Sequence, residues 1–430
     1  MKIEFVNHSC FIIEHAGKRV ICDPWFEGAV FNNGWNLISK TKFQYEDFKN
    51  IDYIWFSHEH PDHFYPPNLK KIPDEYKANI TVLFQNTIDK KVVEYCKGKN
   101  FKSIIELKPD EWVELALDFK ILCEHFAEGD SWICFKGNDL TYLNTNDCGI
   151  RNVKEGRKIK SKVGNVDILL TQFSYAYWAG NPEQTEYRKR IAEEKLGWLK
   201  LQCDLFRPAV VIPIASYIYF SHEENNYLND LINTPQKVFD YINSETKAQA
   251  VILYTGENYF FGENHNSKAS IDNYERDLRQ IQAKKDYFHS PSIELQRILE
   301  FGNTFIEEIN DHNAFYLIAF LKSTTVYLLD LNKSIRISTS GVTVTDIDYE
   351  KCDAAMWSDS LAFCFKFPYG LDTTQINGRL RKPAKGNYHN FYNFFRINHL
   401  KNRGENPNNI SYLSFSVWRK VLTRLRLHEQ

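Results

Sequence analysis

The stretch FSHEHPDHFYPP, residues 56–67, gathers three histidines and two acids directly after the apolar run IDYIWF. That run has the β-branched and aromatic residues typical of a short buried strand. Side chains that cost so much to desolvate need a partner at the point where a buried strand ends. A solvent-exposed polar loop would explain the charge of this stretch, but it would not explain its three histidines.

The ligand pattern in this stretch is His58-x-His60-x-Asp62-His63. Two imidazoles at i and i+2 on an extended loop point the same way, and the last two residues follow on a turn, where they can face a neighbouring position. This arrangement suits two first-row ions in one cleft, about 3.5–4 Å apart. Because such ions prefer neutral imidazole and carboxylate ligands, the sequence predicts two divalent metal ions, with zinc, manganese and iron left open.

The composition is that of a large folded chain. It has 430 residues, 43% of them hydrophobic, so it can bury a sizeable core, and its net charge of −2 indicates neither nucleic acid nor a membrane surface as a partner. The first residues have no uninterrupted apolar region of a signal peptide, and the chain has no run of about 18 apolar residues. Nine cysteines without CxxC spacing argue against a disulfide framework, so we expect a cytoplasmic protein.

The order of elements indicates two domains. Residues 1–255 read as strands followed by alternating strands and helices, which predicts a catalytic α/β domain. The alternation of strands and helices stops after Gly256, where we expect a linker and helical segment over residues 256–290. Residues 291–430 mix strands and helices and predict a smaller α+β domain of unknown role, in which the apolar run AFYLIAFL (residues 314–321) is interpreted as a strand.

The His-x-His-x-Asp-His stretch is a signature of the metallo-β-lactamase superfamily, which the sequence resembles here. The resemblance implies an αββα sandwich with the metals at one edge between two sheets. It also implies a later histidine and then a bridging acid, each after a strand. His125 in ILCEHF and Asp147 in LTYLNTND match these two positions. Taken alone, Asp147 would read as a turn residue or a cap.

The last histidine of the family pattern is where the sequence departs. The family places it just after a strand that ends in Pro-x-His, whereas this chain has Ala215 and Ser216 after VVIP. The nearest histidine is His222, in YIYFSHEENN. The second metal position is therefore ligated by His222 or by water, or it is weak, and a surface position for His222 stays open.

Several stretches resemble the metallo-β-lactamase-type domain of the CMP-N-acetylneuraminate hydroxylases. They span most of residues 50–235: FSHEHPDHFYPPNLKK, HFAEGDSWICFKGNDLTYLNTNDC, TQFSYAYWAGNP and PIASYIYFSHEENNYLN. The resemblance supports a functional His222 and implies that Asp130 hydrogen-bonds a ligand from outside the metal's own ligand set. Those hydroxylases also carry a Rieske module, which needs Cys-x-x-His, and this spacing does not occur in the sequence.

The chemistry predicted for this site is hydrolysis of a phosphodiester, lactone or amide of a small polar substrate, nucleotide- or sugar-linked substrates included. Asp62 would orient the second metal and the nucleophile, Asp147 would bridge the metals, and His222 or a tyrosine would supply the proton. The alternative is a diiron oxygenase that takes electrons from an external donor. A non-catalytic binding protein is a third reading.

Two further stretches offer substrate contacts. The aromatic side chains of Tyr175, Tyr177 and Trp178 follow a strand expected to end at the metal edge, where they could stack on a sugar or a base. Core and loop packing is the alternative. Arg379 and Arg381, in the basic stretch GRLRKPAK, could hold a phosphate, or they could belong to a solvated loop. The expected partner is a small-molecule substrate, and the oligomeric state is open.

Overall fold

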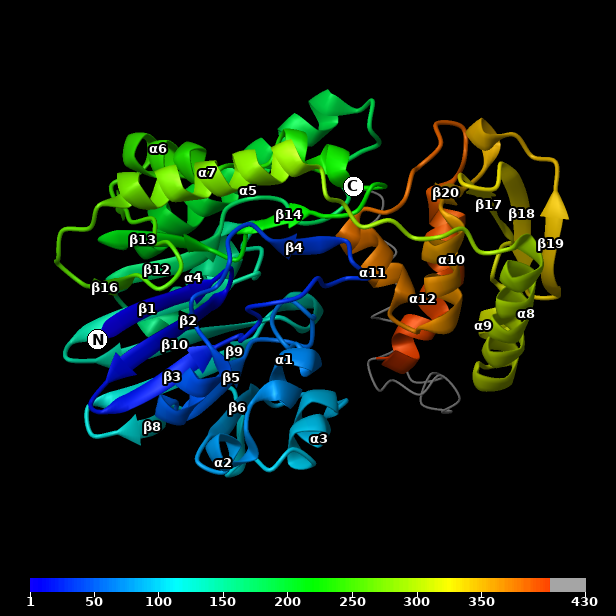
Figure 1. Ribbon diagram of the computed structural model, residues 1–430. Helices are drawn as coiled ribbons and strands as arrows, with labels where there is room; N and C mark the ends of the chain where they lie inside the picture. The colour runs from blue at the N-terminus through cyan, green and yellow to red at the C-terminus, as the bar shows by residue number, and fades with distance from the viewer. Residues whose placement is uncertain (403–430) are drawn as a thin grey trace. The chain divides into compact units, whose positions relative to one another are not determined.

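The computed structural model describes residues 1–402, and the chain divides into two units, the first covering Met1–Phe288 and the second beginning at His289 (Figure 1). The segment 256–290, expected between two domains, contains helix α7 (Ser267–Lys284). Ile271 and Tyr274 of this helix are buried in the core of the first unit. None of the helices described over residues 1–402 is both long enough and apolar enough to cross a membrane.

The first sheet of the N-terminal unit has seven strands. Their order across the sheet is β16 (Asn258–Phe260), β1 (Lys2–Asn7), β2 (Cys10–His15), β3 (Lys18–Cys22), β5 (Tyr53–Phe56), β6 (Thr81–Gln85) and β7 (Ser103–Leu107). Strands β1, β2 and β3 pair antiparallel, and β3, β5, β6 and β7 pair parallel. As a result β1, β3, β5 and β6 all run in the same direction.

The second sheet also has seven strands. Their order is β15 (Gln249–Ala250), β13 (Val210–Ile214), β12 (Ile168–Gln172), β11 (Leu140–Asn146), β10 (Ser131–Gly137), β9 (Phe119–His125) and β8 (Val113–Ala116). Strands β9, β10 and β11 pair antiparallel, whereas β11, β12 and β13 pair parallel. Strands β9, β11, β12 and β13 therefore share one direction.

Helices cover the outer faces of both sheets, as Figure 1 shows. On the first sheet these are α1 (Pro66–Lys71), α2 (Asp74–Lys77) and α3 (Lys91–Lys97); on the second they are α4 (Val153–Val163), α5 (Thr185–Phe206), α6 (Pro235–Glu245) and α7. The main core lies between the sheets, where Phe5 and Trp55 share a cluster with Tyr142 and Leu169. This is the αββα sandwich that the sequence predicts.

Shorter elements complete the first unit. Strands β4 (Trp35–Leu37) and β14 (Ile218–Phe220) pair antiparallel. The short 3-10 turns of this unit are η1 (Tyr45–Asn50), η2 (Ala127–Gly129) and η3 (Asn226–Asp230).

The second unit is a smaller α+β structure, as predicted. Its sheet has the order β19 (Gly341–Thr345), β18 (Lys333–Ser338), β17 (Thr324–Leu328) and β20 (Ala354–Met356). Its helices are α8 (Leu295–His312), α9 (Phe315–Ala319), η4 (Tyr349–Lys351), α10 (Ser358–Lys366), α11 (Gly370–Asn377) and α12 (Tyr388–Asn402). The strand interpretation of residues 314–321 is wrong, because this segment forms α9. A short apolar run fits a helix as well as a strand.

Candidate metal centre

The strand directions bring chemically active residues to one edge of the sandwich. In the first sheet, His8 follows β1, Asp23 follows β3 and the His-rich stretch follows β5. In the second sheet, His125 ends β9 and Asp147 follows β11. Contacts between the two sets, such as Asn146 Nδ2 to Asp23 Oδ2 at 2.5 Å, show that both edges meet.

Four residues at this edge have a left-handed backbone although none of them is glycine. They are His8, Asp23, Asn146 and Ala215, with φ between 43° and 51°. Such a conformation costs of order 1 kcal/mol or more per residue and persists where the surrounding structure imposes it. Each of these residues ends or directly follows a strand, where the surrounding structure can impose the conformation.

Three groups of side chains at this edge have ligand atoms within 4.8 Å of one another. They are His8, Asp62 and His63; His58, His63 and Asp147; and His58, His60 and Asp130. The groups share His58 and His63, whose ring centroids lie 4.2 Å apart. They therefore form one continuous cluster of possible metal ligands.

His63 and His58 form the centre of this cluster. The Nε2 atom of His63 lies 3.1 Å from Asp147 Oδ2 and 3.2 Å from Asp62 Oδ2. The Nε2 atom of His58 lies 2.8 Å from His60 Nδ1 and 3.6 Å from Asp130 Oδ1. Asp130, which the sequence analysis expected outside the ligand set, thus lies among the ligand atoms themselves.

The electrostatics of the cluster favour a bound cation. Burial lowers the pKa of His63, but Asp62, Asp147 and Asp23 outweigh burial and raise it well above its ordinary value. Burial raises the pKa of Asp62, yet His63 and His8 hold it well below its usual range. Burial and the neighbouring histidines His63 and His60 lower the pKa of His58, which keeps its ring neutral as a ligand requires.

Unsatisfied buried atoms test whether the residues present fit metal ions. Within the described part of the chain, Nδ1 of His8 and Oδ1 of Asp62 are buried without a hydrogen-bond partner, while Nε2 of His8 lies 3.4 Å from Asp62 Oδ2. Leaving such atoms unpaired is costly in a folded protein. Imidazole nitrogen and carboxylate oxygen are donor atoms for first-row divalent cations, so the residues fit that group.

Asp23 supports the cluster from behind, and the sequence analysis did not identify it. Its carboxylate accepts hydrogen bonds from Ser57 N at 2.7 Å and Ser57 Oγ at 2.9 Å, and it lies 2.9 Å from His63 Nδ1. A carboxylate on the far nitrogen fixes the orientation of a ligating histidine. His8 was missed as well. The available signal was that both residues directly follow strands of the same sheet as the His-rich stretch.

His125 approaches the cluster but belongs to none of the three groups formed by the described residues. Its Nδ1 lies 3.1 Å from Gln85 Oε1. The amide of Gln85 donates to Ser57 O at 2.8 Å and to Gly129 O at 2.6 Å. Gln85 therefore connects the His-rich loop, the turn η2 and His125.

His222 is fully buried, which rules out the surface position that the sequence left open. Its backbone N–H donates to Asn225 Oδ1 at 2.9 Å, and its Nδ1 accepts from the Glu224 N–H at 3.2 Å. It is not a member of the three groups found among the described residues.

The three aromatic residues predicted to contact substrate differ in how deeply they are buried. Tyr175 is buried, and its hydroxyl donates to Leu228 O at 2.5 Å, so its ring is not available for stacking. Tyr177 and Trp178 are half-buried.

The two arginines considered for phosphate lie in the second unit. Arg379 is buried there and binds both carboxylate oxygens of Asp359 at 2.8 Å. Arg381 pairs its backbone with Ala355. The guanidinium of Arg379 is thus already used in an ion pair.

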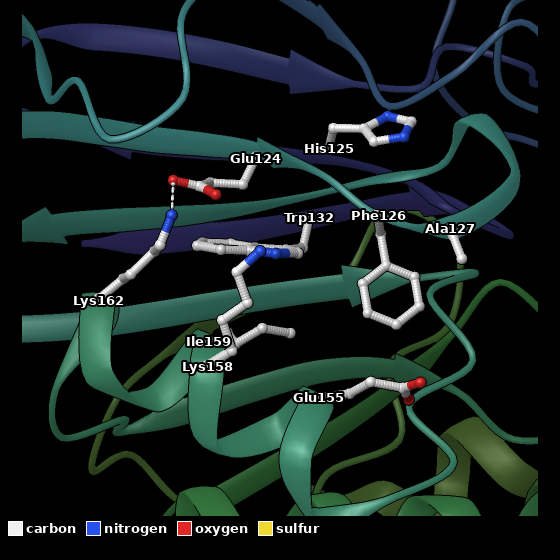
Figure 2. A pocket seen from close by; sticks show the side chains of 9 residues that line it. All are labelled: Glu124, His125, Phe126, Ala127, Trp132, Glu155, Lys158, Ile159 and Lys162. Atoms are coloured by element: carbon white, nitrogen blue, oxygen red, sulfur yellow. Dashed lines mark hydrogen bonds and ion pairs between the residues drawn. The ribbon is translucent and has the colours of Figure 1, made fainter. Parts of the chain in front are cut away.

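A cavity of about 310 Å³ lies beside the cluster, between β9, β10 and α4. Figure 2 shows its lining, in which Lys162 pairs with Glu124 and the ring of His125 points away from the other side chains. Of the metal-centre residues, only His125 borders this cavity. The cavity is therefore lined by none of the residues in the three ligand groups.

Comparisons with known proteins agree with this geometry. Residues 2–194 match the Beta-lactamase superfamily domain. The cytidine monophosphate-N-acetylneuraminic acid hydroxylase of Xenopus laevis is 25% identical over 248 residues, which are 54% of this chain and 40% of that protein. The hydroxylase of Macaca mulatta is 26% identical over 271 residues, 59% of this chain and 44% of that protein. The chain thus spans less than half the length of these relatives.

The solved structures that match this chain include two metalloproteins. CmlA, a diiron beta-hydroxylase from Streptomyces venezuelae, has a TM-score of 0.44 and 14% identity, covering 60% of this chain and 53% of that one. Igni18, a metallo hydrolase from Ignicoccus hospitalis, has a TM-score of 0.43 and 17% identity, covering 61% of this chain and 99% of that one.

The N-terminal unit therefore contains a domain of the metallo-β-lactamase superfamily. Over about 59% of the chain it is distantly homologous to the metallo-β-lactamase-like region of the CMP-N-acetylneuraminic acid hydroxylases.

Proposed function

We propose that this protein is a metal-dependent hydrolase whose dinuclear His/Asp centre acts on a phosphodiester, lactone or amide of a small polar substrate. The observation that carries the proposal is the continuous buried cluster in which His58 and His63 link three groups of ligand atoms. Asp147 shares a group with both histidines, which is the position that a bridging carboxylate requires.

Different residues would bind the two ions. His58 and His60 would hold one ion, Asp62 and His63 would hold the other, and Asp147 would lie between them. When bound, the two cations lower the pKa of a shared water and stabilise charge on the attacked group. The buried Asp62 carboxylate stays ionised because His63 and His8 hold its pKa low.

Proton transfer is assigned to His222. The N–H of Glu224 donates to His222 Nδ1, so the neutral ring carries its proton on Nε2. A neutral imidazole acts as a base, so His222 would first take up a proton and would then, as imidazolium, give that proton to the leaving group. Asp23 acts differently: it accepts from His63 Nδ1–H and so leaves His63 Nε2 facing Asp62 and Asp147.

A diiron oxygenase is the second candidate, and the homology to hydroxylases favours it. Histidine and carboxylate ligands suit iron as well as zinc or manganese. Such an enzyme would take its electrons from a separate donor, and its substrate would be a small polar molecule of the nucleotide-sugar kind.

Metal identity and stoichiometry separate the two candidates. The protein would be purified without added metal and without oxygen, and its metals measured by elemental analysis. Zinc or manganese near two per chain, with hydrolysis of phosphodiesters or lactones, supports the hydrolase. Iron near two per chain, with oxygen consumption in the presence of a reductant, supports the oxygenase. Protein that neither retains nor takes up any of these metals contradicts both.

A further inference from the structure

Lys195 is a buried ammonium group beside the metal centre. It lies on α5, is 7% exposed, and its Nζ donates to Gln172 Oε1 at 2.6 Å. The rings of Tyr177 and Trp198 face it, with their centroids 5.2 and 4.7 Å from Nζ. Across residues 1–402, the ion pairs within 4.0 Å include none that involves Lys195.

The surroundings of Lys195 do not neutralise its charge. An ammonium group has three donors, and Gln172, a neutral amide, accepts from one of them. Aromatic faces attract a cation but carry no net negative charge. A buried lysine is almost always paired with an acid, because an isolated buried charge is costly. The group is therefore arranged to meet an anion that the chain itself does not supply.

Two observations place Lys195 next to the reacting centre. Gln172 ends β12, the parallel neighbour of β11, and Asp147 directly follows β11. Burial lowers the pKa of Lys195 to about 8, while the carboxylates of Asp147 and Asp130 partly offset that effect. Both acids lie in the metal cluster, so Lys195 is within their electrostatic reach.

A second cation, the exposed Arg151, contacts the same indole ring. Arg151, four residues beyond Asp147, places its guanidinium 4.8 Å from the centroid of the Trp198 ring that also faces Lys195. The positive charge of Arg151 lowers the pKa of Lys195. Two like charges on one indole repel each other, and an anion between or beside them would remove that cost.

We propose that Lys195 and Arg151 bind an oxyanion, a phosphate or carboxylate group, of the substrate that is hydrolysed at the metal centre. That the anion belongs to a substrate rests on the function proposed above. The anion site itself rests on the two cations. The substrate class thereby narrows to small molecules that carry a phosphate or carboxylate close to the bond that is broken.

The test is calorimetric titration with inorganic phosphate and, separately, with acetate. Both metal-free and metal-loaded full-length protein would be used, so that binding by the metals can be separated from binding by the chain. We expect metal-free wild type to bind at least one of the two anions, and Lys195→Met to weaken that binding at least tenfold without changing metal content. The preferred anion distinguishes a phosphorylated from a carboxylated substrate.

The matched control is Lys189→Met, which removes the same charge from an exposed position of the same helix and should bind like wild type. Lys195→Arg keeps the charge and should retain most of the affinity. Should Lys195→Met fail to fold, Lys195→Gln and Arg151→Gln provide the same test.

Two outcomes would overturn the anion site. One is binding that requires metal and is unchanged in the Lys195 variants; the other is no binding of either anion. Failure of the proposed function would look different, because metal content is measured on the same samples. Protein that takes up no metal but binds phosphate through Lys195 would contradict the hydrolase and keep the anion site.

Discussion

The Nε2 atom of His63 lies 3.1 Å from Asp147 Oδ2, although 84 positions separate the two residues in the sequence. This contact joins the loop after β5 in one sheet to the loop after β11 in the other. In the proposed dinuclear centre, Asp147 is the residue on which both metal positions would depend.

Replacing Asp147 with Ala should therefore abolish metal retention and activity. The change removes a carboxylate that shares a ligand group with both His58 and His63. His60→Ala should have the same effect on retention, because His60 contacts His58 Nε2. Elemental analysis after desalting measures the loss, and Asp204→Ala, which removes an exposed acid of α5, serves as the control. Full metal retention in the Asp147 or the His60 variant would contradict the site assignment.

Asp23→Asn tests the support behind the ligands. The amide keeps the shape of the side chain, and asparagine tolerates the left-handed backbone at this position. It loses the negative charge that orients the His63 ring. We expect metal affinity to fall by about 10–100-fold, as for other residues that hydrogen-bond a ligand. Titration in a metal buffer measures it, and an affinity equal to that of wild type would mean that Asp23 serves the fold alone.

His222→Ala tests whether His222 is also the last ligand of one metal position, in which case the variant should lose metal from that position only. The three ligand groups of the described residues lack His222, so metal held by His58, His63 and Asp147 should remain. If His222 also gives the proton, activity in the metal-saturated variant should stay low. An unchanged metal count together with unchanged activity would show that His222 contributes only to packing.

Local patterns predict the strands and the His-rich loop that follows one of them. The two-sheet sandwich and the role of Asp147 were predicted from the resemblance to the metallo-β-lactamase superfamily. His8 and Asp23 also follow strands, but one histidine or one Asp-Pro reads equally well as a turn. Gln85 ends β6, the neighbour of β5 in the same sheet, but the strand pattern does not show that its amide contacts Ser57 and that its oxygen lies beside His125. Asp130 reaches His58 because the two sheets face each other there, which is a tertiary property that strand patterns do not contain.

The buried position of Lys195 was a signal that the sequence analysis did not use. Lys195 lies four residues after Ile191 and four before Leu199, on the buried face of helix α5. Its position is decided by Tyr177 from the loop after β12 and by Trp198 one turn along the helix. The sequence analysis considered Tyr177 for stacking on a sugar, whereas its ring faces a lysine.

Lys195→Met should make the protein more stable at neutral pH, although it weakens anion binding. The pKa of Lys195 falls from 10.5 to about 8 on folding, which corresponds to about 3 kcal/mol of unfavourable burial of its charge at pH 7. Methionine has a similar shape and no charge. Part of this gain is lost because Gln172 Oε1 loses its donor, at a cost of about 1 kcal/mol.

The stability difference between Lys195→Met and wild type should depend on pH. Between pH 8 and pH 10.5 the unfolded chain binds the Lys195 proton and the folded chain does not, so the stability of wild type rises with pH in this window. Asp147, Asp130 and Arg151 are the charged groups that act on Lys195, and all three are kept in the variant. Thermal unfolding at pH 7 and at pH 9.5 should therefore show an advantage of Lys195→Met that shrinks as pH rises, with no such change for Lys189→Met. A variant that is less stable than wild type by the same amount at both values would show that the ammonium group is part of the packing and is not held ready for an anion.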